Sequence, residues 1–207
     1  VGPEEGRLAS GRTGLGRLSH TDSVIGGLRE ILGLLDGDLK GKELIITAGG
    51  TQEPLDPVRY IGNHSSGKMG FALAQAGKDR GAKVTLVCAP SNLETPFGVK
   101  RVDVLTTAEM FDVLKEITAT SNALVMAAAP ADFQAHETAH QKLKKRDFQQ
   151  TGFSLPLKET IDILSNLKGG GIRVGFAAET ENISQHAQAK LKSKQLHFIV
   201  ANDVTAP

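Results

Sequence analysis

Short apolar runs alternate with amphipathic stretches along most of this chain. Strand-length apolar runs occupy residues 43–49, 83–90, 100–105, 122–129, 172–179 and 197–203. Stretches with helical spacing lie between them, at residues 65–81, 107–120, 160–170 and 182–195. Near-continuous apolar strands between helices are typical of a parallel sheet covered by helices on both faces. The pattern therefore predicts an α/β fold with a mainly parallel sheet, and Thr106 or Thr107 as the cap of the second helix.

Three segments lie outside this alternation. Residues 1–20 are rich in Gly, Arg and Ser without periodicity, which is typical of a linker or the end of a neighbouring domain. A helix is predicted from Thr21, its candidate cap, to Leu35. Residues 133–156 are polar, and a long irregular insertion in a compact domain is more often a functional loop than filler.

Composition narrows the class of protein. The 207 residues are 40% hydrophobic, which suits one large domain. The net charge of +1 gives no indication of nucleic-acid binding, and residues 123–131, the longest apolar run, are too short to span a membrane. The single cysteine, Cys88, excludes an internal disulfide and fits a reducing compartment. We find no signal peptide at the start, and the missing initiator Met suggests an internal fragment or a processed product.

The stretch Gly62–Lys68 fits the phosphate-loop pattern G-x-x-x-x-G-K, but Met69 stands where such a loop needs Ser or Thr for magnesium. A dinucleotide site is disfavoured because no G-x-G-x-x-G follows the first strand. What remains is the start of a helix, which Asn63, Ser65 and Ser66 can cap. Gly67 has no side chain and allows close approach to the backbone, and the free N–H groups of the first turn favour an anion. Arg59 and Lys68 add positive charge. An ordinary capped helix is the alternative.

Other candidates follow from position. Ligands bind outside the carboxyl ends of strands in an open α/β sheet, and Asp132 follows such an end. Lys190 and Lys194 share one face of a predicted helix, and residues 142–145 carry three lysines. Solvated charges are the alternative for all of these lysines. His136 and His140 have no third ligand nearby, so a zinc site is not predicted.

Several segments in order then resemble one family. They are TAGGTQEPLDPVRYIGNHSSGKMG (47–70), AAAPADF (127–133), KLKK (142–145), GFAAET (175–180) and ANDV (201–204). Together they resemble the phosphopantothenoylcysteine synthetase domain of the bifunctional bacterial coenzyme A biosynthesis flavoprotein, over roughly residues 42–207. Residues 6–18 resemble the tail of the adjoining decarboxylase domain, with Ser10 where that family has its catalytic cysteine.

The resemblance implies a Rossmann-like, doubly wound sheet, a homodimer and a cytoplasmic, CTP-dependent ligase. Its substrates would be 4′-phosphopantothenate, CTP and cysteine, with Mg²⁺ held by the nucleotide phosphates and no metal site from protein alone. FMN would belong only to the decarboxylase domain. It also implies that residues 1–20 are a linker or decarboxylase tail, and that residues 21–207 form the ligase domain, incomplete at its C-terminal end.

Residue roles carry over by position. Asn63 would act at the acyl-cytidylate carbonyl, and Lys142 would meet the phosphates from a mobile flap. The substrate-binding stretch would be Arg59, Asn63, Ser65, Ser66 and Gly67. Nucleotide-binding residues would be Met126, Ala127, Ala128, Asp132, Lys142, Glu159, Thr160, Ile161, Asp162, Phe176, Lys190 and Lys194. In the 159–162 loop, Ile161 replaces the family's proline and Glu159 its basic residue.

Two other functions remain open from the residues alone. One is a non-catalytic nucleotide-binding module on the same fold. The other is an NADP-dependent reductase of the short-chain type. Cations near a nucleotide's phosphates would favour the ligase, because negative charge develops there during nucleotidyl transfer.

Overall fold

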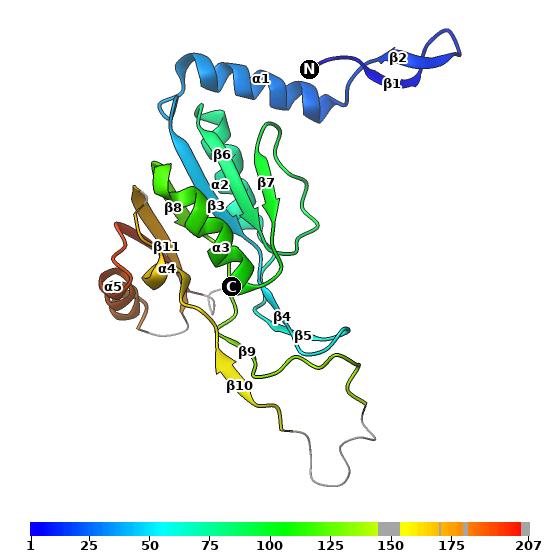
Figure 1. Ribbon diagram of the computed structural model, residues 1–207. Coiled ribbons are helices and arrows are strands. Elements are labelled where there is room, and N and C mark those ends of the chain that lie inside the picture. Colours follow the sequence, from blue (N-terminus) through cyan, green and yellow to red (C-terminus); the bar gives the residue numbers. More distant parts are fainter. Residues whose placement is uncertain (145–153, 170, 180–181, 204–207) are drawn as a thin grey trace.

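The computed structural model describes residues 1–144, 154–169, 171–179 and 182–203 (Figure 1). Its centre is a sheet of six strands, all parallel, in the order β12-β11-β8-β3-β6-β7. The strands are β3 (Glu43–Ala48), β6 (Lys83–Cys88), β7 (Lys100–Asp103), β8 (Ala123–Met126), β11 (Ile172–Glu179) and β12 (Phe198–Asp203). The chain first builds outward from β3 to β7, then returns to β8 on the other side of β3. This is the doubly wound order, so the predicted α/β fold is confirmed.

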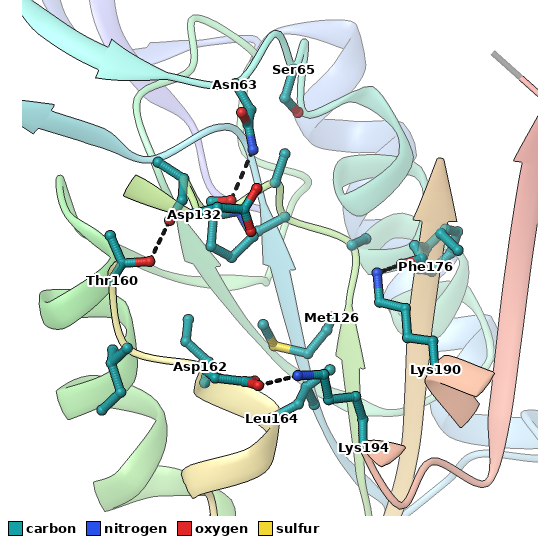
Figure 2. A pocket seen from close by; sticks show the side chains of 18 of the residues that line it. Asn63, Ser65, Met126, Asp132, Thr160, Asp162, Leu164, Phe176, Lys190 and Lys194 are labelled. Carbon is teal, nitrogen blue, oxygen red and sulfur yellow. Dashed lines mark hydrogen bonds and ion pairs between the residues drawn. The ribbon is translucent and has the colours of Figure 1, made fainter. Parts of the chain in front are cut away.

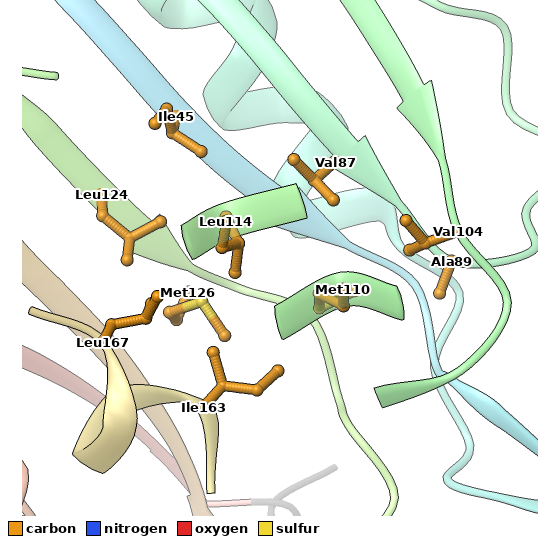
Figure 3. Close-up of a cluster of buried hydrophobic side chains, with 10 residues drawn as sticks. All are labelled: Ile45, Val87, Ala89, Val104, Met110, Leu114, Leu124, Met126, Ile163 and Leu167. Atoms are coloured by element: carbon orange, nitrogen blue, oxygen red, sulfur yellow. The ribbon is translucent and has the colours of Figure 1, made fainter. Parts of the chain in front are cut away.

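Helices cover both faces of this sheet. The helical segments are α1 (Thr21–Asp36), α2 (Lys68–Asp79), α3 (Thr107–Ile117), a 3₁₀ turn (Thr118–Thr120), α4 (Ile163–Asn166) and α5 (Ile183–Ser193). On one face, Met110 and Leu114 of α3 pack with Ile163 of α4 against the strands (Figure 3). On the other face, Phe71 and Ala74 of α2 form a second buried cluster. The apolar strand pattern arises because both faces are buried.

Helix α2 packs very closely against β3. A Cβ atom at Gly70 would lie 2.5 Å from the Cβ atom of Ala48 and 2.7 Å from the carbonyl oxygen of Thr47. Only a residue without a side chain fits this crossing. The close contact sets where the loop before α2 lies relative to the carboxyl end of β3.

The N-terminal segment, residues 1–20, contains an antiparallel hairpin of β1 (Glu4–Arg7) and β2 (Thr13–Arg17), beside one end of α1 (Figure 1). The predicted cap of α1 is wrong, because Thr21 is the first helical residue and His20 holds the N-cap position without a side-chain bond. The apolar stripe of α1 stays exposed, with Leu28 56% and Leu35 64% accessible.

The helix expected over residues 160–170 is reduced to the four residues of α4. Asp162 is its N-cap, and its carboxylate accepts from the Ser165 amide at 3.2 Å. The Arg173 guanidinium donates to the carbonyls of Leu167 at 2.7 Å and Gly169 at 2.8 Å. These side-chain bonds hold the chain after α4 in a non-helical path, so they override the helical spacing of the sequence.

Two small antiparallel sheets lie beyond the carboxyl ends of the central strands. They pair β4 (Gln52–Pro54) with β5 (Tyr60–Gly62), and β9 (Phe133–Ala135) with β10 (Leu157–Glu159). The segment expected to be an irregular insertion is thus partly structured at its start, and residues 145–153 lie outside the described residues. Across the described residues, no helix is long and apolar enough to cross a membrane.

Candidate functional site

A pocket of about 710 Å³ opens at the carboxyl ends of β8 and β11. It lies beside the point where the strand order reverses, between β3 and β8, which is where doubly wound sheets bind ligands. The volume is within the usual range for small-molecule sites. Asn63 and Asp132 reach it from loops on one side, and Lys190 of α5 and Lys194, the C-cap of α5, reach it on the other (Figure 2).

Asn63 is held in place by the AAAPAD loop, residues 127–132, which follows β8. Its Nδ2 atom donates to the carbonyl oxygen of Pro130 at 2.9 Å, so the turn before α2 and the AAAPAD loop touch at the pocket's edge (Figure 2). An amide nitrogen carries two donors. One is used on Pro130, which leaves the second N–H for a ligand.

A chain of buried hydrogen bonds also holds the AAAPAD loop in place. The Ala131 amide donates to Thr51 Oγ1 at 2.8 Å, and Thr51 Oγ1 lies 2.9 Å from Thr107 Oγ1. The Thr107 hydroxyl donates to Glu53 at 2.8 Å, so the Thr51 hydroxyl is left to donate to Thr107. All four residues are at most 3% exposed. Hydrogen bonds in such a chain polarise and strengthen one another.

A second buried hydroxyl, that of Thr47 in β3, also binds the backbone of the AAAPAD loop. Thr47 Oγ1 accepts from the Ala128 amide at 3.0 Å and lies 3.7 Å from the Met126 sulfur. Met126 and Ala128 both line the pocket. The backbone of the AAAPAD loop is therefore set by hydroxyls of β3 and of the segment that follows it.

Lys190 of α5 and Lys194, the C-cap that follows α5, are held at the pocket wall. Lys190 Nζ donates to the Phe176 carbonyl at 3.0 Å, and Lys194 Nζ is ion-paired with Asp162 and lies 3.3 Å from Ser165 Oγ. Burial acts to raise the pKa of Asp162, but hydrogen bonds from Lys194 and Ser165 outweigh it and lower that pKa. An ammonium has three donors, so both lysines keep capacity for an anionic ligand.

The structure brings most of the predicted residues to this pocket. Those that line it are Asn63, Ser65, Met126, Ala127, Ala128, Asp132, Glu159, Thr160, Ile161, Asp162, Phe176, Lys190 and Lys194. Four do not line it: Arg59, Ser66, Gly67 and Lys142. Lys142 is exposed in the segment after β9, and its proposed contact with phosphates stays a prediction.

Arg59 is occupied elsewhere. Its Nε and Nη2 atoms donate to Asp56 Oδ2 at 2.9 and 2.5 Å, and Nη2 also donates to the carbonyl of Leu143 at 2.5 Å. Asp56, whose side chain is fully buried, also accepts from the amides of Val58, Arg59 and Leu143. Burial acts to raise the pKa of Asp56, but these bonds hold it well below its ordinary value of 3.8.

The helix start differs in detail from the prediction. The N-cap of α2 is Gly67, with φ of 74°, and it makes no side-chain cap bond. Ser65 Oγ instead accepts from the Gly67 amide at 3.3 Å, and Ser66 Oγ from the Lys68 amide at 3.4 Å. Asn63 does not cap the helix. A left-handed N-cap lets the turn fold back beside Gly49.

Among the described residues, no group of three His, Cys, Asp or Glu side chains could hold a metal ion. Mg²⁺ commonly binds through one or two carboxylates together with substrate phosphates. Asp132 lines the pocket and suits that arrangement, whereas Asp162 is engaged by Lys194. The carboxylate of Asp132 is thus placed where it could meet a metal ion carried by a bound nucleotide.

Sequence reasoning did not single out Thr51, Glu53 or Asp56, and it named Thr107 only as a candidate helix cap. Asp56 carried a usable signal, because Asp followed by Pro favours a turn in which the carboxylate accepts later amides. The buried threonines carried none, since a threonine beside an apolar run is equally suited to a strand surface. Asn202, which also lines the pocket, lies in the last apolar run.

Comparison with known proteins gives consistent matches. A family model described as the DNA/pantothenate metabolism flavoprotein C-terminal domain matches residues 39–207. The coenzyme A biosynthesis bifunctional protein CoaBC of Haemophilus influenzae is 42% identical over 211 residues, covering 99% of this chain and 51% of that protein. The protein of the same name from Escherichia coli strain K12 is 42% identical over 214 residues, covering 100% and 52%. The chain thus spans about half the length of these relatives.

A solved structure matches as well. The crystal structure of the C-terminal domain of coenzyme A biosynthesis bifunctional protein CoaBC superimposes with a TM-score of 0.70 at 36% identity. The match covers 80% of this chain and 79% of that one.

Proposed function

Because the chain belongs to the DNA/pantothenate metabolism flavoprotein C-terminal domain family, we propose that it is a phosphopantothenate–cysteine ligase that uses CTP. The observation that carries the proposal is the pocket itself. A held side-chain amide, Asn63, lies on one wall, and two lysines, Lys190 and Lys194, lie on the other. An acyl transfer driven by a nucleotide needs both kinds of group.

The first step would join the acid to the nucleotide. A carboxylate oxygen of 4′-phosphopantothenate attacks the α-phosphorus of CTP, the bond to the bridging oxygen breaks, and pyrophosphate leaves. Lys190 and Lys194 would neutralise the charge that grows on the phosphates. Lys142 would assist from the segment after β9, and Mg²⁺ with Asp132 would orient the phosphates.

The second step would form the amide. The cysteine amine attacks the acyl carbonyl, CMP leaves, and the amine gives up its proton. Negative charge develops on the carbonyl oxygen, and the second N–H of Asn63 would donate to it. The backbone of Met126, Ala127 and Ala128 would hold the nucleotide, with Phe176 beside the cytosine ring. The 159–162 loop and Ser65 would complete the contacts.

A pyrophosphate-release assay tests this proposal. With CTP, Mg²⁺ and 4′-phosphopantothenate but no cysteine, wild-type protein should release pyrophosphate. Lys190→Ala should slow that step. Asn63→Ala should permit some release but slow amide formation by about 10²–10³-fold once cysteine is added, the usual cost of one oxyanion donor. Lys192→Ala is the matched control, since Lys192 lies on α5 outside the pocket lining.

Three results would count against the ligase. Intact, dimeric protein that makes no CTP-dependent pyrophosphate would overturn it. Thermal stabilisation by NADPH alone, in a panel with CTP and ATP, would favour the reductase instead. Stabilisation by CTP without turnover would favour a non-catalytic nucleotide-binding module.

The assembly and setting belong to the same proposal. We propose a homodimer in the cytoplasm, as the family resemblance implies. We also propose that residues 21–207 are the ligase domain, and that residues 1–20 are a linker or the tail of a decarboxylase domain. FMN would bind only to that other domain. Size-exclusion chromatography with light scattering tests the dimer.

A further inference from the structure

One buried carboxylate joins two loops that are far apart in sequence. Asp56 lies in the loop between β4 and β5, and Leu143 lies in the segment after β9, 87 residues later. The Leu143 amide donates to Asp56 Oδ2 at 3.1 Å. Its carbonyl accepts from Arg59 Nη2 at 2.5 Å. Both polar groups of one backbone unit are therefore bound by one Asp–Arg pair.

The pair is itself held rigidly. Asp56 Oδ1 accepts from the amides of Val58 and Arg59, both at 2.8 Å, which fixes the carboxylate in a tight turn. Oδ2 takes the Arg59 guanidinium and the Leu143 amide. The side chain of Asp56 is fully buried, so little of its charge is screened by water.

The neighbouring contacts extend the attachment. The Ala139 amide donates to the Leu55 carbonyl at 2.9 Å, and Thr138 Oγ1 donates to the Pro54 carbonyl at 3.2 Å. The segment 138–143 is thus bound along the loop 54–59 at three points. Lys142 comes directly before the bound unit, so its backbone position follows from the attachment.

We infer that Asp56 is a positioning residue, which acts with Arg59 to hold the Leu143 backbone and thereby sets where Lys142 presents its ammonium group. The inference rests on the proposed function, in which Lys142 serves pyrophosphate release. It gives Arg59 a role different from direct substrate binding, since its guanidinium is already engaged by Asp56 and Leu143.

Asp56→Asn separates this role from simple folding. The asparagine oxygen can still accept from Val58 and Arg59 and keep the turn. Its NH₂ group then faces the Leu143 amide and the Arg59 guanidinium, which are donors, so the Leu143 amide loses its acceptor. Asp38→Asn is the matched control, because Asp38 also forms a paired contact with an arginine, Arg80, on an exposed surface.

Two measurements are made on the purified chain. Hydrogen exchange should be faster at the Leu143 amide in Asp56→Asn and unchanged in Asp38→Asn. The kcat of pyrophosphate release should fall by about 10–100-fold, as expected for a small misplacement of a catalytic group. Asp56→Asn combined with Lys142→Ala should lose no more than Lys142→Ala alone, because both remove the same contribution.

Arg59→Lys provides a second variant if Asp56→Asn does not fold. A lysine cannot bridge Asp56 and Leu143 with a planar fork, so the same acceleration of exchange is expected. Unchanged exchange at Leu143 in a folded variant would overturn the inference. Losses that multiply in the double variant would also overturn it. If wild-type protein releases no pyrophosphate, the proposed function fails, and the exchange measurement still decides whether the attachment exists.

Discussion

Replacing Thr51 by valine tests the buried hydrogen-bond chain behind the pocket. Valine has nearly the same shape, so little cavity forms. The Ala131 amide would lose its acceptor, and Thr107 would lose its incoming donor. Leaving a buried donor unsatisfied costs about 1–3 kcal/mol, and losing a further hydrogen bond costs about 0.5–1.5 kcal/mol.

The expected loss is therefore about 1.5–4.5 kcal/mol of unfolding free energy. That is a large share of the roughly 5–15 kcal/mol typical of a folded domain. Simple transfer energies predict the opposite sign, because valine is the more apolar residue. Urea unfolding followed by circular dichroism measures the difference, with the m-value as a check that the unfolded state is unchanged.

Thr51→Ser is the matched control. Serine keeps the oxygen that accepts from Ala131 and removes one methyl group, for a cost of about 1 kcal/mol. The valine variant should therefore be the less stable of the two. Calorimetry should also show weaker CTP binding for the valine variant, since Ala131 and Asp132 line the pocket. If valine proved as stable as wild type, or more stable than serine, the reasoning from the hydrogen-bond chain would be refuted.

Three further predictions concern packing, charge and the N-terminal segment. Gly70→Ala should destabilise the fold by about 1–3 kcal/mol through overpacking against β3, whereas Gly14→Ala, with no atom near the new methyl group, should leave the melting temperature nearly unchanged. Because the folded pKa of Asp162 is lowered, its pair with Lys194 stabilises the fold above about pH 3.8 and is lost as the pH falls toward the lowered value. Asp162→Asn should therefore reduce the fall of the unfolding free energy with decreasing pH in that range, by no more than about 1 kcal/mol because the pair is partly exposed. An unchanged pH dependence of the unfolding free energy would contradict this. Deleting residues 1–20 should leave pyrophosphate release intact, and a folded but inactive deletion variant would show that the hairpin takes part.

The sequence correctly predicted those elements that are set by residues close together in the chain, such as a helix cap or an apolar run. The helix α3 begins where Thr106 and Glu109 form a reciprocal capping box, and Thr106 was a predicted cap. The strand β11 has the predicted bounds of 172–179, and its apolar run pairs with β8 on one side and β12 on the other. Lys190 and Lys194 were predicted to share a helix face, and the structure brings both to one pocket, although α5 ends at Ser193 and Lys194 is its C-cap.

What the sequence missed depends on partners distant in the chain or on contacts that end a local pattern. The helix expected at 160–170 is cut short because Arg173 binds its carbonyls. Arg59 was expected at the substrate, yet its partner Leu143 lies 84 residues away, and no local pattern marks that contact. The Thr51–Thr107 bond joins residues 56 positions apart. Periodicity reports which face of an element is buried, but not which distant polar group it meets.

The strand order also has a consequence for how the chain folds during synthesis. Of the six strands in the central sheet, β3, β6 and β7 leave the ribosome first and can form one half of it, while the other edge of β3 stays unpaired until β8 is made. Ile46 of β3 pairs with Val125 of β8, far later in the chain. Until then an apolar strand edge stays open to other nascent chains, a recognised route to aggregation. The pocket walls on β8, β11 and α5 are all synthesised after β7, so a ligand can bind the complete pocket only after the open edge of β3 has paired with β8.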